Sequence, residues 1–268
     1  MSVTLIIGAA GGIGTALSRQ LAARGHKLVL ADAGTNVYGE GHDAEPVERL
    51  AKTLPGTVYQ ATDVRGDGAL EGLVDFAYAS FGELHSAVYL AGFRHERSVV
   101  RTRPSDLRRV LAVHLEAPLA LMKACAQRWT ELRQSGSLVI GTGPSAFFGV
   151  AGQAALSAAG AGVVAAVRSA AVELHRKNIR VNAVAPTART RLTEHLPLFQ
   201  GVGDGSLSVE PVARLIGHLL SDDAADVSGE ILGAAGERLY ALQSRETAGT
   251  FVEAEGSIAA EWDRIVRG

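Results

Sequence analysis

Short apolar runs alternate with helical patterns along most of the chain, and this alternation restricts the fold more than any other sequence feature. Several runs lack the inside–outside alternation of a half-exposed strand, which is typical of strands buried on both faces of a parallel sheet. The pattern therefore predicts an α/β fold with a doubly wound, parallel, seven-stranded sheet and helices on both faces. The predicted strands are Thr4–Ile7, Leu28–Ala31, Thr57–Gln60, Ser86–Leu90, Ser137–Ile140, Arg180–Val184 and Glu230–Leu232.

The helical segments between these strands are not interrupted by a repeat or a low-complexity linker. We therefore expect one domain over residues 1–240, followed by a polar tail over residues 241–268. The tail has one possible helix at Ile258–Val266 and is expected to dock on the domain or on a neighbouring subunit, or to stay solvated. The other predicted helices are Gly12–Arg24, Ala44–Leu54, Gly68–Phe81, Pro104–Gln134, Gly152–Lys177 and Glu210–Ser221.

Composition and charge indicate a cytoplasmic protein that binds neither nucleic acid nor membrane. The net charge of the 268 residues is −2, and basic residues are dispersed along the chain. The single cysteine, Cys125, excludes an internal disulfide, and its apolar neighbours predict a buried thiol. The longest uncharged stretch of small apolar residues, Ala158 to Val167, is too short to span a bilayer. No metal site is predicted.

A cluster of glycines joins the first predicted strand to the first predicted helix. Glycine lets the backbone turn tightly there and lets a pyrophosphate approach, while the helix N-terminus offers free N–H groups and its positive dipole end. A glycine cluster alone is a weak signal, but the order strand, glycines, helix is a strong one. It predicts a Rossmann-type cofactor site that includes Gly8, Gly11, Gly12, Ile13 and Gly14.

Two acidic residues follow the next strands. Asp32 ends the second predicted strand, where a carboxylate accepts hydrogen bonds from the adenosine ribose and repels a 2′-phosphate. This position favours NAD(H) over NADP(H), the simpler alternative being a helix or turn cap. Asp63 and Val64 follow the third strand, and Asp63 is expected to hold the adenine, to cap the helix that starts near Asp67, or to do both.

The order of these motifs along residues 1 to about 240 resembles that of the short-chain dehydrogenase/reductase family. Within that family the chain is most similar to the 3-hydroxyacyl-CoA dehydrogenase units of multifunctional enzymes, through the Gly-rich insert 34–43 and the segments 112–115 and 186–193. The resemblance adds Ala91, Gly92 and Pro186 to the cofactor residues. The motifs are Gly8…Gly12-Ile13-Gly14, Asp32, Asp63-Val64, Ala91-Gly92, Arg180 to Pro186 and Ser228-Gly229.

In that family a Tyr hydroxyl gives or takes the proton during hydride transfer. A Lys one helical turn further on lowers the pKa of the Tyr, and a Ser orients the substrate oxygen. In this chain Leu156 stands at the Tyr position, Gly160 at the Lys position and Gly143 at the Ser position. His114 stands at the position of a fourth residue, an Asn, as also happens in the hydroxyacyl-CoA subfamily. The resemblance therefore implies that no catalytic residue is intact.

A shift of the alignment does not restore the site. No tyrosine lies between Leu90 and Leu239, and no lysine lies between Ala124 and Arg176. Tyr89 and His114 are the alternative proton donors, since His titrates near neutral pH. Each is read more simply as a structural residue.

Three functions remain open from the sequence. The first is a non-catalytic subunit of a hetero-oligomeric alcohol dehydrogenase that acts on an acyl-CoA. It pairs with an active homologue through the helices around 104–134 and 152–177, because the family forms its subunit interface with these two helices. The second is an NAD(H)-dependent oxidoreductase with a relocated proton relay. The third is a nucleotide-sensing regulator without chemistry.

Overall fold

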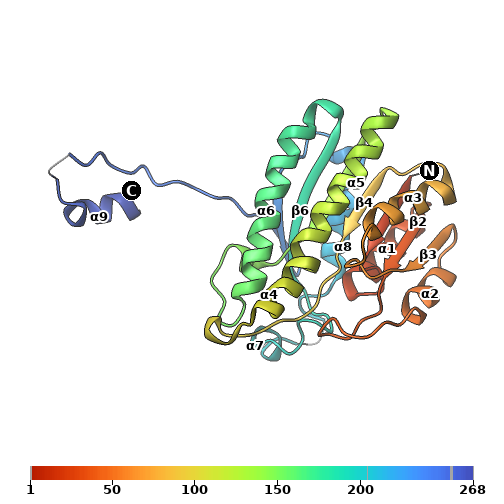
Figure 1. Ribbon diagram of the computed structural model, residues 1–268, viewed down its shortest axis with the longest axis horizontal. Coiled ribbons are helices and arrows are strands. Elements are labelled where there is room, and N and C mark those ends of the chain that lie inside the picture. Colours follow the sequence, from red (N-terminus) through yellow and green to blue (C-terminus); the bar gives the residue numbers. More distant parts are fainter. Residues whose placement is uncertain (1, 204, 254–255, 268) are drawn as a thin grey trace.

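The computed structural model describes residues 2–203, 205–253 and 256–267 and contains a sheet with the strand order β3-β2-β1-β4-β5-β6-β7-β8 (Figure 1). The strands β1 to β7 run parallel, as predicted. The chain crosses from β3 at the edge of the sheet to β4, so the strand order reverses between β1 and β4. The strands are β1 Val3–Ile7, β2 Lys27–Asp32, β3 Thr57–Ala61, β4 Ser86–Tyr89, β5 Gly136–Gly141, β6 Ile179–Thr187, β7 Ile231–Ala235 and β8 Arg238–Ala241.

Helices cover both faces of the sheet and bury an apolar core on each. On one face α3, α5 and α6 pack against the strands, and on the other face α1, α2 and α8 do so (Figure 1). Burial of the strands on both faces explains why their sequences lack alternation. The helices are α1 Gly12–Ala23, α2 Glu45–Lys52, α3 Ala69–Phe81, α4 Pro104–Leu111, α5 Ala117–Leu132, α6 Ala154–Leu174, α7 Pro197–Gln200, α8 Glu210–Leu219 and α9 Ile258–Arg267.

The sheet has eight strands rather than the seven that the sequence predicts. A turn at Gly236 and Glu237 returns the chain as β8, which pairs antiparallel with β7, and Gly236 adopts a left-handed φ of +56°. The ring of Tyr240 covers Gly233, where a Cβ atom would lie 2.3 Å from the ring. The strand is short and its residues lie at the exposed edge of the sheet, so its sequence has no apolar run to predict it.

The predicted helix 104–134 is divided by a single wide turn. A π-helical turn at Ala112–Glu116 lies between α4 and α5, and it carries His114. Turns of this kind occur mostly inside α-helices and often at functional sites. The turn keeps the helical direction while changing which side chains face the sheet, so a periodic sequence pattern does not reveal it.

The tail begins on the domain and then leaves it. The N–H of Leu242 donates to the Ile231 carbonyl (2.8 Å), and Arg168 on α6 donates to the Ser244 hydroxyl (3.0 Å). Further on, α9 lies apart from the sheet and its helices (Figure 1), and its Trp262 is 58% exposed. The described part of α9 therefore makes no docking contact with its own domain, and docking on a neighbouring subunit stays a prediction. Residues 254, 255 and 268 of the tail lie outside the described residues.

Among the described helices, α6 with its C-terminal extension to Lys177 is long and apolar enough, by length and composition alone, to cross a membrane. Its inner face packs against β6 and α5 and is buried at Val163 and Val167, as in the core helix of a globular domain. An exposed stripe of small, uncharged residues runs along its outer side for five turns, with Arg168 and Glu173 at its margins. The stripe consists of Ala154, Ala158, Ala161, Ala165, Ser169 and Val172.

Candidate functional site

One cavity of about 650 Å³ opens at the carboxyl ends of the parallel strands, where the strand order reverses between β1 and β4. Ligands of open α/β sheets bind in such a crevice. Every residue that the sequence assigned to the cofactor lines this cavity, as do the four positions at which the sequence predicts replaced catalytic residues. The first set is Gly8, Gly11, Gly12, Ile13, Gly14, Asp32, Asp63, Val64, Ala91, Gly92 and Pro186, and the second is His114, Gly143, Leu156 and Gly160.

The glycine turn at the head of α1 leaves no room for side chains at two of its positions. Gly8 has a φ of +82°, and a Cβ atom on it would lie 2.6 Å from the backbone nitrogen of Ala91. A Cβ atom on Gly14 would lie 2.3 Å from the Gly8 carbonyl oxygen. The N-cap of α1 is Gly11, which has no side chain to occupy the free N–H groups, and the first turn carries no acidic residue. The turn therefore fits a bound pyrophosphate.

Asp32 lies between the glycine turn and the Gly-rich insert. Its Oδ2 accepts a hydrogen bond from the backbone N–H of Ala10 (2.9 Å), and its Oδ1 accepts one from Gly34 (2.8 Å). These two bonds fix the carboxylate at the end of β2, beside the cavity. Each carboxylate oxygen has a second lone pair, so Asp32 fits the hydroxyls of an adenosine ribose.

Asp63 forms a local ion pair and does not cap a helix. Its carboxylate accepts a two-pronged hydrogen bond from Arg65, which lowers the pKa of Asp63, and its Oδ1 also accepts the backbone N–H of Arg65 (2.9 Å). The following helix, α3, has Gly68 as its N-cap and has no side-chain cap. The prediction that Asp63 caps the helix starting near Asp67 is therefore wrong. The predicted contact of Asp63 with the adenine stays a prediction.

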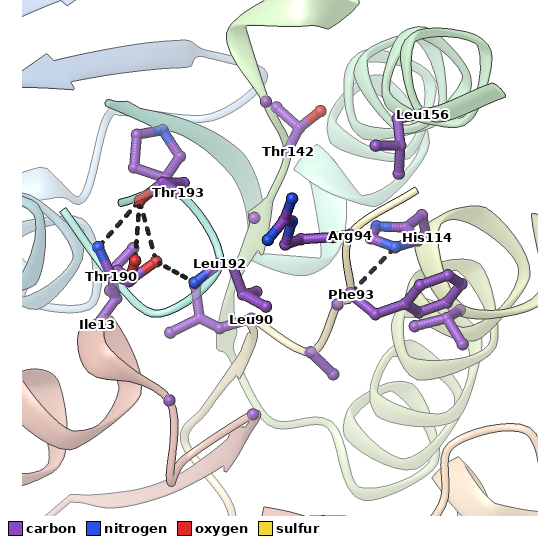
Figure 2. A pocket seen from close by; sticks show the side chains of 18 of the residues that line it. Ile13, Leu90, Phe93, Arg94, His114, Thr142, Leu156, Thr190, Leu192 and Thr193 are labelled. Atoms are coloured by element: carbon purple, nitrogen blue, oxygen red, sulfur yellow. Dashed lines mark hydrogen bonds between the residues drawn. The ribbon is translucent and has the colours of Figure 1, made fainter. Parts of the chain in front are cut away.

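The positions predicted to have lost the relay residues share one wall of the cavity, and Figure 2 shows Leu156 pointing into it. Around Gly143 there is room, since a Cβ atom there would lie 3.6 Å from the Ser145 hydroxyl. Around Gly160 there is none, because a Cβ atom would lie 2.9 Å from Thr142 Oγ1 and 3.1 Å from Ala146 Cβ. Thr142 and Ala146 thus occupy the space into which a lysine at position 160 would first extend.

The two alternative proton donors are held in structural contacts. The hydroxyl of Tyr89 donates to the Val113 carbonyl (2.6 Å), and burial raises the pKa of this phenol far above its usual value. His114 Nε2 accepts a hydrogen bond from the backbone N–H of Phe93 (3.3 Å; Figure 2), and burial lowers the pKa of His114 to about 4. At neutral pH neither group exchanges a proton readily, since one stays protonated and the other stays neutral.

The loop after β4 brings charged residues to the cavity that the sequence reasoning missed. Arg94 and Glu96 line it, and His195 reaches Glu96 from the segment after β6, with 3.3 Å between His195 Nε2 and Glu96 Oε1. Arg94 stands two residues after Gly92, just beyond the end of a parallel strand. The rule that identified Asp32 and Asp63 at strand ends also selects Arg94, whereas nothing in the sequence brings His195 to this loop.

The sheet order, the glycine turn and the carboxylate at the end of β2 define a Rossmann-type protein with a site built for a dinucleotide. The chain belongs to the short-chain dehydrogenase/reductase family. Residues 8–236 match a family model described as enoyl-(acyl carrier protein) reductase. The chain is 35% identical over 251 residues to cis-4-hydroxycyclohexanecarboxylate dehydrogenase of Sinomonas cyclohexanicum, which covers 87% of this chain and 95% of that protein.

This chain spans only part of the length of some of its relatives. The peroxisomal hydratase-dehydrogenase-epimerase of Saccharomyces cerevisiae is 31% identical over 200 residues, which are 72% of this chain and 22% of that enzyme. Among solved structures, 3-ketoacyl-(acyl-carrier-protein) reductase from Brucella melitensis complexed with NADH has the same fold. Its TM-score is 0.78 at 23% identity, over 87% of this chain and 96% of that one.

The depressed pKa of His114 predicts a measurable acid sensitivity of the fold. Between pH 6.5 and pH 4 this histidine takes up a proton only when the chain unfolds, so the free energy of unfolding falls as the pH falls. We expect His114→Asn to remove on the order of 3 kcal/mol of that loss. Urea unfolding at several pH values measures it, with the exposed His42→Asn as the control. An unchanged pH dependence in His114→Asn would contradict the assignment.

The close packing around Gly160 predicts that an alanine there destabilises the protein. Alanine normally stabilises a helix relative to glycine by about 1 kcal/mol, and Gly72→Ala in α3, where a Cβ atom meets nothing within 4 Å, should do so. Gly160→Ala should instead lower the free energy of unfolding by about 1–3 kcal/mol, because its Cβ atom overpacks against Thr142 and Ala146. Adding Thr142→Ala should recover part of that loss in a double-mutant cycle. Equal stabilisation by both glycine substitutions would show that the position is open.

Proposed function

We propose that this chain is a cytoplasmic, NAD(H)-binding, non-catalytic subunit of a hetero-oligomeric alcohol dehydrogenase of the hydroxyacyl-CoA type. One observation carries the proposal: the cavity wall where a proton relay is expected presents Gly143, Leu156 and Gly160. A leucine offers no proton and a glycine offers no charge, so hydride transfer here lacks its acid–base partner.

The cavity of this chain supports cofactor binding without catalysis. Bound NAD(H) supplies a hydride donor or acceptor, and the glycine turn, Asp32 and the segment from Pro186 would hold it. The solved relative that carries NADH has the same sheet. Among the described residues of the cavity, neither Tyr89 nor His114 offers a readily exchanged proton, because Tyr89 donates to Val113 and His114 stays neutral. A relocated relay is therefore the weaker alternative.

The outer faces of α5 and α6 support pairing with a second subunit of the same fold. The exposed side of α6 carries a stripe of small, uncharged residues that lets another helix approach closely, and Leu119 on α5 is also exposed. The apolar side of α9 lies free of its own domain and suits a neighbouring subunit as well. Pairing would place an active site next to this one and would provide the acyl-CoA chemistry that this chain lacks.

The proposal is tested by purifying the chain alone and together with the homologue encoded beside it. The isolated chain should turn over a panel of 3-hydroxyacyl-CoA substrates with NAD⁺ on the order of 10²–10⁴-fold more slowly than the pair, which is the usual effect of losing an acid–base group. Native mass spectrometry should show a hetero-oligomer. Robust turnover by the homomer, or a chain that forms only homo-oligomers, would overturn the proposal.

A matched pair of variants then locates the interface. Ala165→Glu places a charge on the outer face of α6 and should abolish the hetero-oligomer, whereas Ala79→Glu places the same charge on an exposed position of α3 and should not. A nucleotide-sensing regulator, in contrast, would bind NAD(H) and capture a partner from outside the family.

Asp32 predicts the cofactor preference. Asp32→Ser removes the charge that repels a 2′-phosphate and the acceptor for the ribose hydroxyls, so NAD⁺ affinity should fall about 10- to 100-fold while the preference over NADP⁺ narrows. Isothermal titration with both nucleotides measures this, and Asp67→Ala serves as an exposed control. A wild-type chain that binds NADP⁺ at least as tightly as NAD⁺ would refute this role of Asp32.

A further inference from the structure

A cationic side chain enters the cavity from the loop after β4. The backbone N–H of Arg94 donates to the Val37 carbonyl (2.8 Å), and this bond anchors the residue against the Gly-rich insert. Its guanidinium carbon lies 5.6 Å from the centre of the Tyr38 ring. Figure 2 shows the side chain reaching into the cavity, whose lining also includes Thr142, Leu192, His114 and Leu156. Only 19% of the side chain is exposed.

The hydrogen-bonding capacity of Arg94 is mostly unused. Its Nε atom is buried and has no hydrogen-bond partner within the described residues. Glu96 Oε1 lies 3.6 Å from that Nε, too far for a hydrogen bond, and is closer to His195 Nε2 at 3.3 Å. A guanidinium carries five N–H donors and stays charged at every accessible pH. A bound anion would accept the unused hydrogen bonds of this partly buried guanidinium and would balance its charge.

The other cations of the cavity have partners. Arg65 is bound to the Asp63 carboxylate, and Arg191 donates to the Thr35 carbonyl (2.9 Å). Many of the other residues that line the cavity are apolar, and they include Leu90, Phe93, Val113, Leu156, Leu192 and Leu196.

We propose that Arg94 binds the carboxylate of a small organic acid whose hydrocarbon body packs against these apolar residues. A planar guanidinium matches a carboxylate through two parallel hydrogen bonds, and a single cation beside Glu96 suits one negative charge rather than two. Apolar surroundings lower the local dielectric constant, which strengthens such a pair. The proposal requires only this cavity and holds whether or not the chain pairs with a homologue.

Binding of matched acids and amides to the purified full chain tests the proposal. The probes are hexanoate and cyclohexanecarboxylate, each compared with its uncharged amide by isothermal titration in the presence and absence of NAD⁺. We expect each acid to bind at least tenfold more tightly than its amide. Arg94→Met should abolish that preference, whereas Arg97→Met, which removes a neighbouring cation paired with Asp106, should leave it unchanged. Thermal unfolding checks that each variant is folded.

Glu96→Gln separates ligand binding from a structural role. Removing the competing carboxylate beside Nε should raise the affinity for the acids several-fold and leave that for the amides unchanged.

Equal binding of acid and amide by the wild-type chain would overturn the proposal. So would an Arg94→Met variant that loses NAD⁺ affinity and keeps its preference for the acid, because Arg94 would then serve a cofactor phosphate. A lack of NAD⁺ binding with acid preference intact would contradict the proposed cofactor and leave the carboxylate site standing.

Discussion

The close approach of two backbone segments at the middle of the sheet determines the rest of this structure. The turn after β1 passes so near the segment after β4 that Gly8 cannot carry a side chain, since a Cβ atom would lie 2.6 Å from Ala91 N. These two strands are neighbours across the reversal of strand order. Their contact sets the floor of the cavity, and the strand ends and loops on either side form its walls.

Much of this arrangement follows from the sequence, because it depends on features that repeat locally. Buried parallel strands have continuous apolar runs, and the glycines between β1 and α1 can serve only a tight turn. Because the carboxyl ends of parallel strands share one edge of the sheet, the predicted site residues Asp32, Asp63 and Gly143 line one cavity. The strand β8 escaped prediction because an exposed edge strand needs no apolar run. The π turn at Ala112–Glu116 escaped because it shifts the helical phase without breaking the helix.

The site also has one part that the sequence predicts and one that it does not. The cofactor end is predictable from the sequence, because each residue there acts through its own strand end or turn. The packing around Gly160 is not predictable, because it depends on Thr142 and Ala146, which come from the loop after β5. The sequence shows a glycine at position 160, but only the structure shows that Thr142 and Ala146 fill the space beside it. This part of the cavity is a largely apolar chamber into which the Arg94 side chain reaches.

The Gly-rich insert 34–43 joins the two ends of this chamber. Residues outside the insert hold its backbone at both ends of the site. The Gly34 N–H donates to the Asp32 carboxylate, Arg191 donates to the Thr35 carbonyl, the Arg94 N–H donates to the Val37 carbonyl, and Arg109 donates to the Tyr38 carbonyl. A glycine-rich segment loses much conformational freedom on folding, and such contacts must offset that entropy. Residues from both halves of the site therefore order the insert together. Removing the contacts in one half would raise the mobility of the insert, which also borders the other half.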